Sequence, residues 1–334
     1  MINNYFLFIF IIIIINIFFL FKFNFYSKLF TIEDKPSHER KLHKKNTKVL
    51  GGTIIIINIL LYILYFFIFN KSYLIDVFNG QNKILFFAIG AMSIYILGLI
   101  DDKYDLPALN KLLLLILIIS TSLFFNKSLI KEINLSFLDS KINLGQLSFF
   151  FTLFAYIVFM NAFNMLDGIN LQAGMYSCFI LIVLILFGMD LLLGLIIIFS
   201  ILVFLKLNYQ NKIFLGDNGT LLLSYIFSYL FIDMYNQQKI IYSDTILLIL
   251  IIPGLEIIRL TFERFKANKN ILKPDRNHIH HIISFKKNTY LGVFLIHLIL
   301  IFPFLLSTIY TNNLSIIICT TIFYFLLVFL FKNK

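Results

Sequence analysis

Three polar side chains recur at every third position in the segment NAFNMLDG, at the end of a long apolar run. They are Asn161, Asn164 and Asp167. On a helix end, this spacing places them on one face. Amide and carboxylate groups are costly at the end of an apolar segment, which indicates that they bind something charged, such as a metal–phosphate group. A single asparagine would be explained as well by hydrogen bonding between helices.

A second acidic group lies in the segment GLIDDKYDLPALNK. Asp101 and Asp102 are adjacent at the end of one apolar run, and Lys111 begins the next. Adjacent carboxylates repel each other, which prepares one of them to act as a base, or they neutralise a metal ion or a cationic partner. The simpler alternative is a solvated acidic loop that caps a helix.

The segment FLGDNGTLLLS places Asp217 in a tight glycine turn that leads into a helix. A helix N-terminus attracts phosphate, and a carboxylate there is a suitable oxygen ligand for Mg²⁺. Taken alone, this segment is explained better by a turn in which Asp217 caps the helix.

The segment PDRNHIHH combines a guanidinium with clustered imidazoles: Arg276, His278, His280 and His281. Phosphate binding or proton handling is favoured over a zinc site, because no cysteine or suitably spaced carboxylate set accompanies the histidines. A solvated basic loop against anionic lipid is the alternative. In the apolar run before it, Glu256 and Arg259 are three residues apart, and an internal ion pair is expected.

These segments interrupt a chain of 334 residues that is 60% apolar and only 13% charged. A soluble domain carries roughly 25% charged residues, and a membrane helix needs about 20 apolar residues. The sequence predicts an all-α, polytopic membrane protein with one transmembrane domain over 1–334. Eleven helices are expected near 5–22, 52–69, 84–100, 109–125, 147–163, 171–188, 191–206, 219–235, 244–262, 290–309 and 314–331.

If all eleven helices span, the polar segments fall on one face of the membrane, in loops near 23–51, 101–111, 164–170, 206–218 and 263–289. Most of the 28 lysines and arginines lie on that face too. The positive-inside rule makes it cytoplasmic, with the N-terminus outside and the C-terminus inside. Orientation and anionic lipid explain the net charge of +11 better than nucleic acid does.

Three minor features have structural explanations. Cys178 and Cys319 lie inside apolar runs, so core packing is expected and neither a disulfide nor a zinc site. His297 lies in mid-span and is expected to make a hydrogen-bonded helix contact. The first apolar run is expected to be a retained span and not a signal peptide.

Taken in order, five segments resemble the polyprenyl-phosphate N-acetylhexosamine-1-phosphate transferases of glycosyltransferase family 4. They are PSHERKLHKKNTKVLGG, DDKYDLPALNK, NAFNMLDGIN, FLGDNG and PDRNHIHH. The ordered set is specific, and it is closer to the WecA and TagO side of the family than to MraY. The resemblance implies that a membrane-held polyprenyl phosphate attacks the β-phosphate of a UDP-sugar, releases UMP and leaves a polyprenyl-pyrophosphoryl sugar.

The resemblance also implies residue roles. Mg²⁺, or Mn²⁺ in its place, is held by Asp217 and Asn164. Asp101 acts as the base toward the lipid phosphate, with Asp102 beside it, and a covalent route through an aspartate stays open. The nucleotide and phosphates are contacted by Asn161, Asp167, Asn170, Lys111, Arg276, His278, His280 and His281. Asn170 and Glu256 stand where relatives carry aspartate.

The predicted function is transfer of an N-acetylhexosamine 1-phosphate to undecaprenyl phosphate, which starts a lipid-linked cell-envelope glycan at the cytoplasmic face of a bacterial inner membrane. An MraY-like transfer of phospho-MurNAc-pentapeptide is one alternative. A secondary transporter of anions or nucleotide-sugars is another, although transporters place charges near mid-membrane and these acids lie at span ends. The expected partners are the lipid phosphate, the UDP-sugar and the bilayer, without nucleic acid. The sequence sets neither the sugar nor the oligomeric state, so a homodimer is left open.

Overall fold

Long helices dominate the computed structural model, which describes residues 2–29, 32–34, 46–268, 277–279, 282 and 289–332. All eleven apolar runs predicted from the sequence are helices, which confirms this part of the prediction. They are α1 (Ile2–Phe21), α3 (Gly51–Phe69), α5 (Gln81–Tyr104), α6 (Ala108–Asn126), α7 (Ser148–Leu166), α8 (Gln172–Leu186), α9 (Leu191–Tyr209), α10 (Gly216–Asn236), α11 (Ser243–Lys266), α13 (Thr289–Ile309) and α14 (Asn313–Lys332). Two short helices, α2 (Phe23–Leu29) and α4 (Lys71–Phe78), join them.

Within the described residues, eight helices are long and apolar enough to cross a membrane, with mean hydropathies between 1.8 and 2.6. Shorter apolar stretches lie in α1 and α8. Many large apolar side chains are exposed along these helices, among them Phe10, Leu186 and Phe329. Water penalises such a surface and lipid does not. The chain is therefore an all-α, multi-pass membrane protein. The total of eleven spans and the orientation stay predictions.

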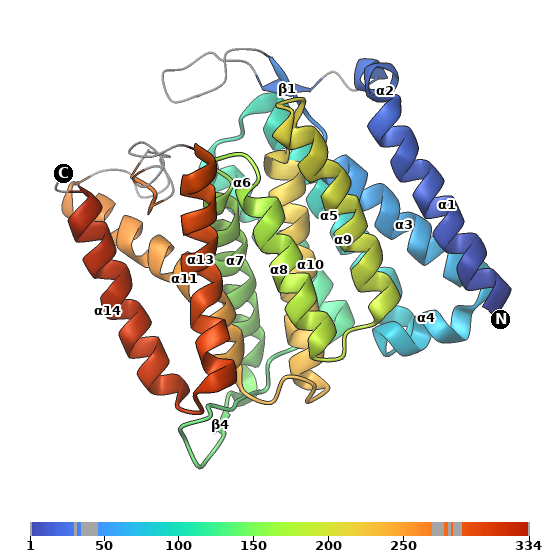
Figure 1. The fold of residues 1–334 in the computed structure, drawn as a ribbon. Helices are drawn as coiled ribbons and strands as arrows, with labels where there is room; N and C mark the ends of the chain where they lie inside the picture. Colours follow the sequence, from blue (N-terminus) through green and yellow to red (C-terminus); the bar gives the residue numbers. More distant parts are fainter. Residues whose placement is uncertain are drawn as a thin grey trace. The chain divides into compact units, whose positions relative to one another are not determined.

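The chain divides into two compact units, the first made of Met1–Lys127 and Leu181–Ile226, the second of Ser128–Ile180 and Phe227–Lys334. In the first unit, α3 packs against α9 and α5, and α5 packs against α6 (Figure 1). Helix α1 packs on α3 and α9. The assignment of 1–334 to one transferase domain stays a prediction.

A reciprocal amide pair fixes α1 against α3. Asn16 Nδ2 donates to Asn58 Oδ1 over 2.7 Å, and Asn58 Nδ2 donates back over 3.2 Å. Each amide also donates to a carbonyl one turn earlier in its own helix. Both side chains are fully buried. Amides satisfied in this way hold membrane helices in one register.

A small sheet in the first unit brings two helix N-termini together. Strand β1 (Glu33–Asp34) pairs antiparallel with β2 (Thr47–Val49), and β2 pairs parallel with β5 (Ile213–Phe214). Strand β2 leads directly into α3, and β5 leads directly into α10. Segments from the predicted loops 23–51 and 206–218 are therefore paired, as expected for loops on one face of a membrane protein.

In the second unit, α11 packs against α7, α13 and α14 (Figure 1). A hairpin of β3 (Glu132–Ile133) and β4 (Ile142–Asn143), followed by a short 3₁₀ helix at Gly145–Leu147, precedes α7. The buried carboxylate of Asp244, at the start of α11, accepts hydrogen bonds from the backbone N–H of Ser136 (3.0 Å) and the amide of Asn313 (2.8 Å). These bonds tie the hairpin and α14 to α11.

One minor prediction is confirmed and another is partly wrong. His297 is buried, with Nδ1 2.8 Å from the carbonyl oxygen of Val293 and Nε2 3.2 Å from that of Gln172. Its ring therefore serves as a contact between α13 and the start of α8. Cys178 and Cys319 are free thiols, but Cys178 is half-buried and Cys319 is exposed on α14, so core packing was wrong for Cys319, because its apolar run turns this position outward.

Candidate active site

A carboxylate from α5 binds the N-terminus of α10. Asp102 Oδ1 accepts a hydrogen bond from the backbone N–H of Asp217 (2.8 Å). Its Oδ2 accepts from the backbone N–H of Asn218 (2.9 Å) and from the Asn218 amide (2.6 Å). The first N–H groups of a helix lack partners within it and carry partial positive charge, so this carboxylate satisfies them and stabilises the helix end.

This arrangement changes two expectations for the GDNG segment. Asp217 lies inside the first turn of α10 and does not cap it. The anion at the N–H groups of Asp217 and Asn218 is the side chain of Asp102, where a substrate phosphate was expected. The tight turn itself is confirmed, because Gly216 begins the helix with a φ of +70°.

Two glycines allow α10 to approach α3 and α5 closely. A Cβ atom added at Gly98 would lie 2.3 Å from Cα of Asn218. A Cβ atom added at Gly52 would lie 2.2 Å from Oδ1 of the same Asn218. Any side chain at these positions would displace the first turn of α10. The two glycines therefore set the distance at which Asp102 reaches the N–H groups of that turn.

The ammonium of Lys111 lies between two carboxylates. Its Nζ is 2.7 Å from Asp101 Oδ2 and 2.7 Å from Asp217 Oδ2. The other oxygen of Asp101 accepts the backbone N–H of Leu106 at 2.9 Å, so the turn after α5 holds this carboxylate. Three predicted site residues from segments far apart in sequence thus meet in the first unit.

Negative charge exceeds positive charge in this cluster. Among the described residues, the ammonium of Lys111 pairs with Asp101 and Asp217, and the third carboxylate, that of Asp102, accepts N–H groups of α10. The Asp217 side chain is 26% exposed and that of Lys111 is 17% exposed, so the cluster is open to a ligand. Mg²⁺ binds one or two carboxylates together with water and substrate phosphates, and Asp217 and Asp101 offer oxygens of this kind. No group of three or more metal-binding side chains occurs among the described residues, so a site made of protein ligands alone is absent there.

In the second unit, the predicted amide and carboxylate stripe lies at the end of α7, as expected. Asn161, Asn164 and Asp167 are half-buried, while the alternating apolar residues Phe163 and Leu166 are fully buried. Asn161 and Asn164 lie within α7, and Asp167 directly follows its last residue with a non-helical φ of −80° and ψ of 49°. Asn170, also half-buried, follows in the turn before α8.

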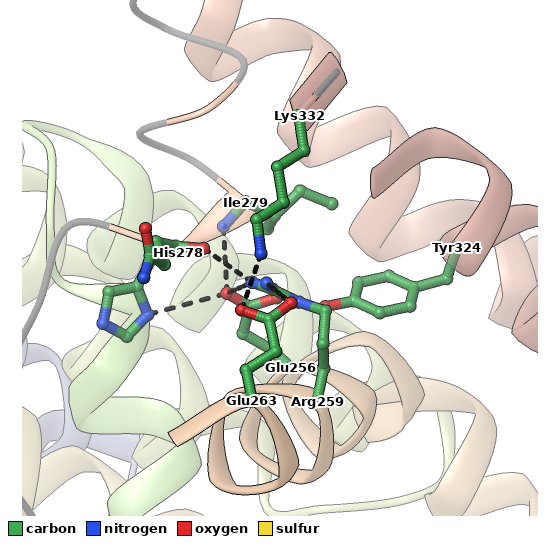
Figure 2. A network of polar contacts seen from close by, with 8 residues as sticks. Glu256, Arg259, Glu263, His278, Ile279, Tyr324 and Lys332 are labelled. Atoms are coloured by element: carbon green, nitrogen blue, oxygen red, sulfur yellow. Dashed lines mark hydrogen bonds and ion pairs between the residues drawn. The ribbon is translucent and has the colours of Figure 1, made fainter. Parts of the chain in front are cut away.

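His278 is the one member of the histidine cluster that the structure describes; Arg276, His280 and His281 lie outside the described residues. It is a buried residue in a short segment beside α11 and α14. The predicted ion pair between Glu256 and Arg259 is confirmed, with Nη2 2.8 Å from Oε1. Figure 2 shows that this pair contacts the segment carrying His278.

Two groups of residues around these sites were not predicted. Gly98 and Asn218 bear directly on the geometry of the acidic cluster. The only sequence signal for Asn218 was the DNG turn. Tyr324 contacts the Glu256–Arg259 pair, but it lies in an apolar run in which Thr320 and Thr321 are its nearest polar neighbours and no charged residue marks it.

Comparison with known proteins places these features in a family. The model of glycosyl transferase family 4 matches residues 84–235. The probable undecaprenyl-phosphate N-acetylglucosaminyl 1-phosphate transferase of Bacillus subtilis is 31% identical over 315 residues, which cover 89% of this chain and 82% of the relative. The undecaprenyl-phosphate alpha-N-acetylglucosaminyl 1-phosphate transferase of Escherichia coli K12 is 28% identical over 264 residues, covering 75% of this chain and 69% of the relative.

The relative of the same name from Yersinia pestis is 25% identical over 264 residues, with the same shares covered. The acidic cluster draws its members from inside the matched range, whereas Glu256, Arg259 and His278 lie beyond it. The match to the Bacillus subtilis protein extends over most of both chains. The protein described here belongs to glycosyl transferase family 4.

Proposed function

We propose that this protein transfers a sugar 1-phosphate from a UDP-sugar to undecaprenyl phosphate and releases UMP. The sugar proposed is N-acetylglucosamine, which the names of the relatives contain. The observation that carries the proposal is the acidic cluster in which Lys111 bridges Asp101 and Asp217. A reaction between two phosphates needs positive charge, which offsets the repulsion between the phosphates. It also needs a carboxylate that accepts a proton.

In the proposed reaction, an oxygen of the lipid phosphate forms a bond to the β-phosphorus of the UDP-sugar. The bond from that phosphorus to the bridging oxygen breaks, and its electron pair leaves with UMP. We assign proton removal from the lipid phosphate to Asp101. Its position is set by the backbone N–H of Leu106 and by Lys111. Lys111 is assigned to phosphate binding, because an ammonium shared by two carboxylates can transfer one of these contacts to an incoming phosphate.

Mg²⁺ is the proposed cofactor, and Mn²⁺ is the substitute. Asp217 supplies one protein ligand, because its carboxylate is 26% exposed, against 7% for Asp101, and lies in the first turn of α10. The ion, when bound, would neutralise charge on the diphosphate. Asp102 receives a positioning role in this proposal, because three N–H groups occupy its two oxygens.

For the second unit, we propose that the stripe at the end of α7 and the histidine segment bind the nucleotide diphosphate. Asn161, Asp167 and Asn170 supply hydrogen-bonding groups, and Asn164 supplies an oxygen for the metal. His278 supplies a donor to phosphate. These assignments rest on residue type and on the partial exposure of the four polar residues at and after the end of α7.

The proposed location is the cytoplasmic face of a bacterial inner membrane. The excess of lysine and arginine in the predicted loops of one face supports this orientation. Pairing of β2 with β5, and contact of Asp102 with α10, also bring three of those loops together within the first unit.

The test is release of UMP by purified protein supplied with undecaprenyl phosphate, Mg²⁺ and labelled UDP-N-acetylglucosamine. We expect UMP and a lipid-linked product in equal amounts. A panel of UDP-sugars that includes UDP-MurNAc-pentapeptide separates the proposed activity from the MraY-like alternative. Uptake of intact UDP-sugar into vesicles without UMP would refute the proposal in favour of a transporter.

A further inference from the structure

A buried polar network in the second unit joins α11 to α14. Arg259 donates from Nη2 to Glu256 Oε1 (2.8 Å) and from Nε to the hydroxyl oxygen of Tyr324 (2.9 Å). That hydroxyl donates in turn to Glu256 Oε2. Figure 2 shows the three side chains converging from the two helices. Glu256, Arg259 and Tyr324, called the clamp below, are all buried.

The clamp holds both polar groups of a short backbone segment. Arg259 Nη2 donates to the carbonyl oxygen of Asn277 over 2.7 Å. Glu256 Oε1 accepts the backbone N–H of Ile279 over 2.9 Å. Between these two anchors lies His278, whose Nδ1 is 3.6 Å from Glu256 Oε1, just beyond hydrogen-bond length.

A second ion pair supports the clamp from its outer side. Arg259 Nη1 donates to Glu263 Oε1 over 2.9 Å, and Lys332 Nζ lies 2.9 Å from Glu263 Oε2. Two carboxylates are thus balanced by two cations, and the guanidinium uses all three of its nitrogens. An orientation defined by so many bonds leaves little freedom at the backbone of Asn277–Ile279.

The cost of this network indicates a purpose beyond holding two helices together. A buried ion pair contributes little to stability compared with apolar residues of similar volume, and charges inside membrane segments are rare unless they serve a function. Helices α11 and α14 already pack against each other. What the clamp adds is the fixed position of the His278 segment.

We propose that Glu256, Arg259 and Tyr324 are positioning residues that orient His278 toward the diphosphate. This inference rests on the proposed function of the protein and extends it to a residue on α14. It makes the hydroxyl group of Tyr324 important for turnover, although that hydroxyl acts only through Glu256 and Arg259.

The test compares two tyrosines of the second unit that each lose a buried hydroxyl. Tyr324→Phe removes the bonds within the clamp. Tyr176→Phe is the matched control, because the Tyr176 hydroxyl donates to the carbonyl of Ile249 in α11 over 2.6 Å but does not contact the clamp. We expect Tyr324→Phe to lower kcat about 10- to 100-fold with little change in KM, as loss of an orienting partner does in other sites. Tyr176→Phe should keep the kcat of the wild type per folded molecule.

Arg259→Lys provides a second variant, because it keeps the charge but loses the planar group that reaches four partners. It should lower kcat as Tyr324→Phe does. Hydrogen exchange at the backbone N–H of Ile279 should become faster in both clamp variants and stay unchanged in Tyr176→Phe.

Wild-type kcat in both Tyr324→Phe and Arg259→Lys would overturn the inference. An equal loss of kcat in Tyr176→Phe would also overturn it, since the effect would then be one of general packing. Failure of the wild type itself to release UMP would refute the proposed function instead, while unchanged exchange at Ile279 in the clamp variants would refute the clamp independently of activity.

Discussion

Two clusters of carboxylates and cations lie in the two units of this protein, and they differ in balance and exposure. In the first, among the described residues, the ammonium of Lys111 pairs with two of three carboxylates, those of Asp101 and Asp217, while the third, that of Asp102, accepts N–H groups of α10. In the second, two glutamates meet two cations. Its central pair, Glu256 and Arg259, has side chains only 3% exposed, whereas Glu263 and Lys332 at its edge are 28% and 44% exposed. The first cluster is open at Asp217, and the second is closed at its central pair.

The difference indicates what each cluster does. An excess of negative charge that water can reach is stabilised when a cation binds, so the first cluster is suited to a metal ion and its phosphate ligands. A neutral network with its hydrogen bonds satisfied gains nothing from a ligand, so the second is suited to holding neighbouring groups in place. Residue type is similar in both, and charge balance separates the proposed binding site from the proposed positioning network.

The largest effect is expected from Asp217→Asn in the open cluster. Loss of this charge should lower kcat by about 10³- to 10⁴-fold, or about 4–5.5 kcal/mol of barrier. The melting temperature of this variant should stay the same or rise, because repulsion among the carboxylates falls while Lys111 keeps Asp101 as its partner. UMP release and thermal unfolding measure the two quantities.

Asp105→Asn is the matched control for this prediction. Asp105 is exposed and follows α5 in the left-handed region, with a φ of 51°, which asparagine also adopts readily. Activity close to that of the wild type is expected. Substantial turnover by Asp217→Asn would place the metal elsewhere and break the contrast between the two clusters.

Removing the cation from each cluster tests the contrast directly. Arg259→Met leaves the buried carboxylate of Glu256 without its cation and should cost about 3–5 kcal/mol of unfolding free energy, with no recovery on adding Mg²⁺. Lys111→Met should cost about 1–3 kcal/mol, because one of its two partners, Asp217, is partly exposed, and Mg²⁺ should restore part of the loss. Unfolding is followed with and without Mg²⁺. Equal losses of unfolding free energy in the two variants, both unchanged by added Mg²⁺, would contradict an open, cation-binding first cluster.

A smaller effect is expected at the backbone that shapes the open cluster. Gly98→Ala would place Cβ 2.3 Å from Cα of Asn218, so α10 must shift. We expect a loss of about 1–3 kcal/mol in stability, as for other overpacked sites, with weaker activity.

The control is Gly254→Ala in α11, where no described atom lies within 4 Å of the added Cβ. This variant should be neutral or more stable by about 0.5–1 kcal/mol, because alanine favours the helix. A Gly98→Ala protein as stable and active as Gly254→Ala would show that close approach of α10 is not required.

Several features could be read from the sequence because they depend on local pattern. Apolar runs of about 20 residues predict helices whatever they pack against. The three-residue spacing of Asn161, Asn164 and Asp167 predicts a stripe, and the pair Glu256 and Arg259 is close enough along one helix to meet by its spacing alone. Each of these predictions needs only helical geometry. The helices and the ion pair are confirmed, whereas only Asn161 and Asn164 of the stripe lie in α7, because the helix ends at Leu166 before Asp167.

Contacts across long separations could not be read in this way. The carboxylate of Asp102 was predicted beside a catalytic base, whereas it caps α10 from α5. Nothing near Tyr324 marks it as a partner of Arg259, because one tyrosine in an apolar run is compatible with simple packing. Such pairings depend on which helices are neighbours, and one sequence does not specify that.

The amino-acid sequence by itself determined the helices, the membrane environment and the chemical groups available for phosphate transfer, because hydrophobicity and charge are properties of the residues. Tertiary structure alone decided which carboxylates share the ammonium of Lys111 and which carboxylate caps the N-terminus of α10. The physical reason is that the charge balance of a site is a sum over neighbours in space. Those neighbours are set by how closely the helices pack, here at Gly52 and Gly98.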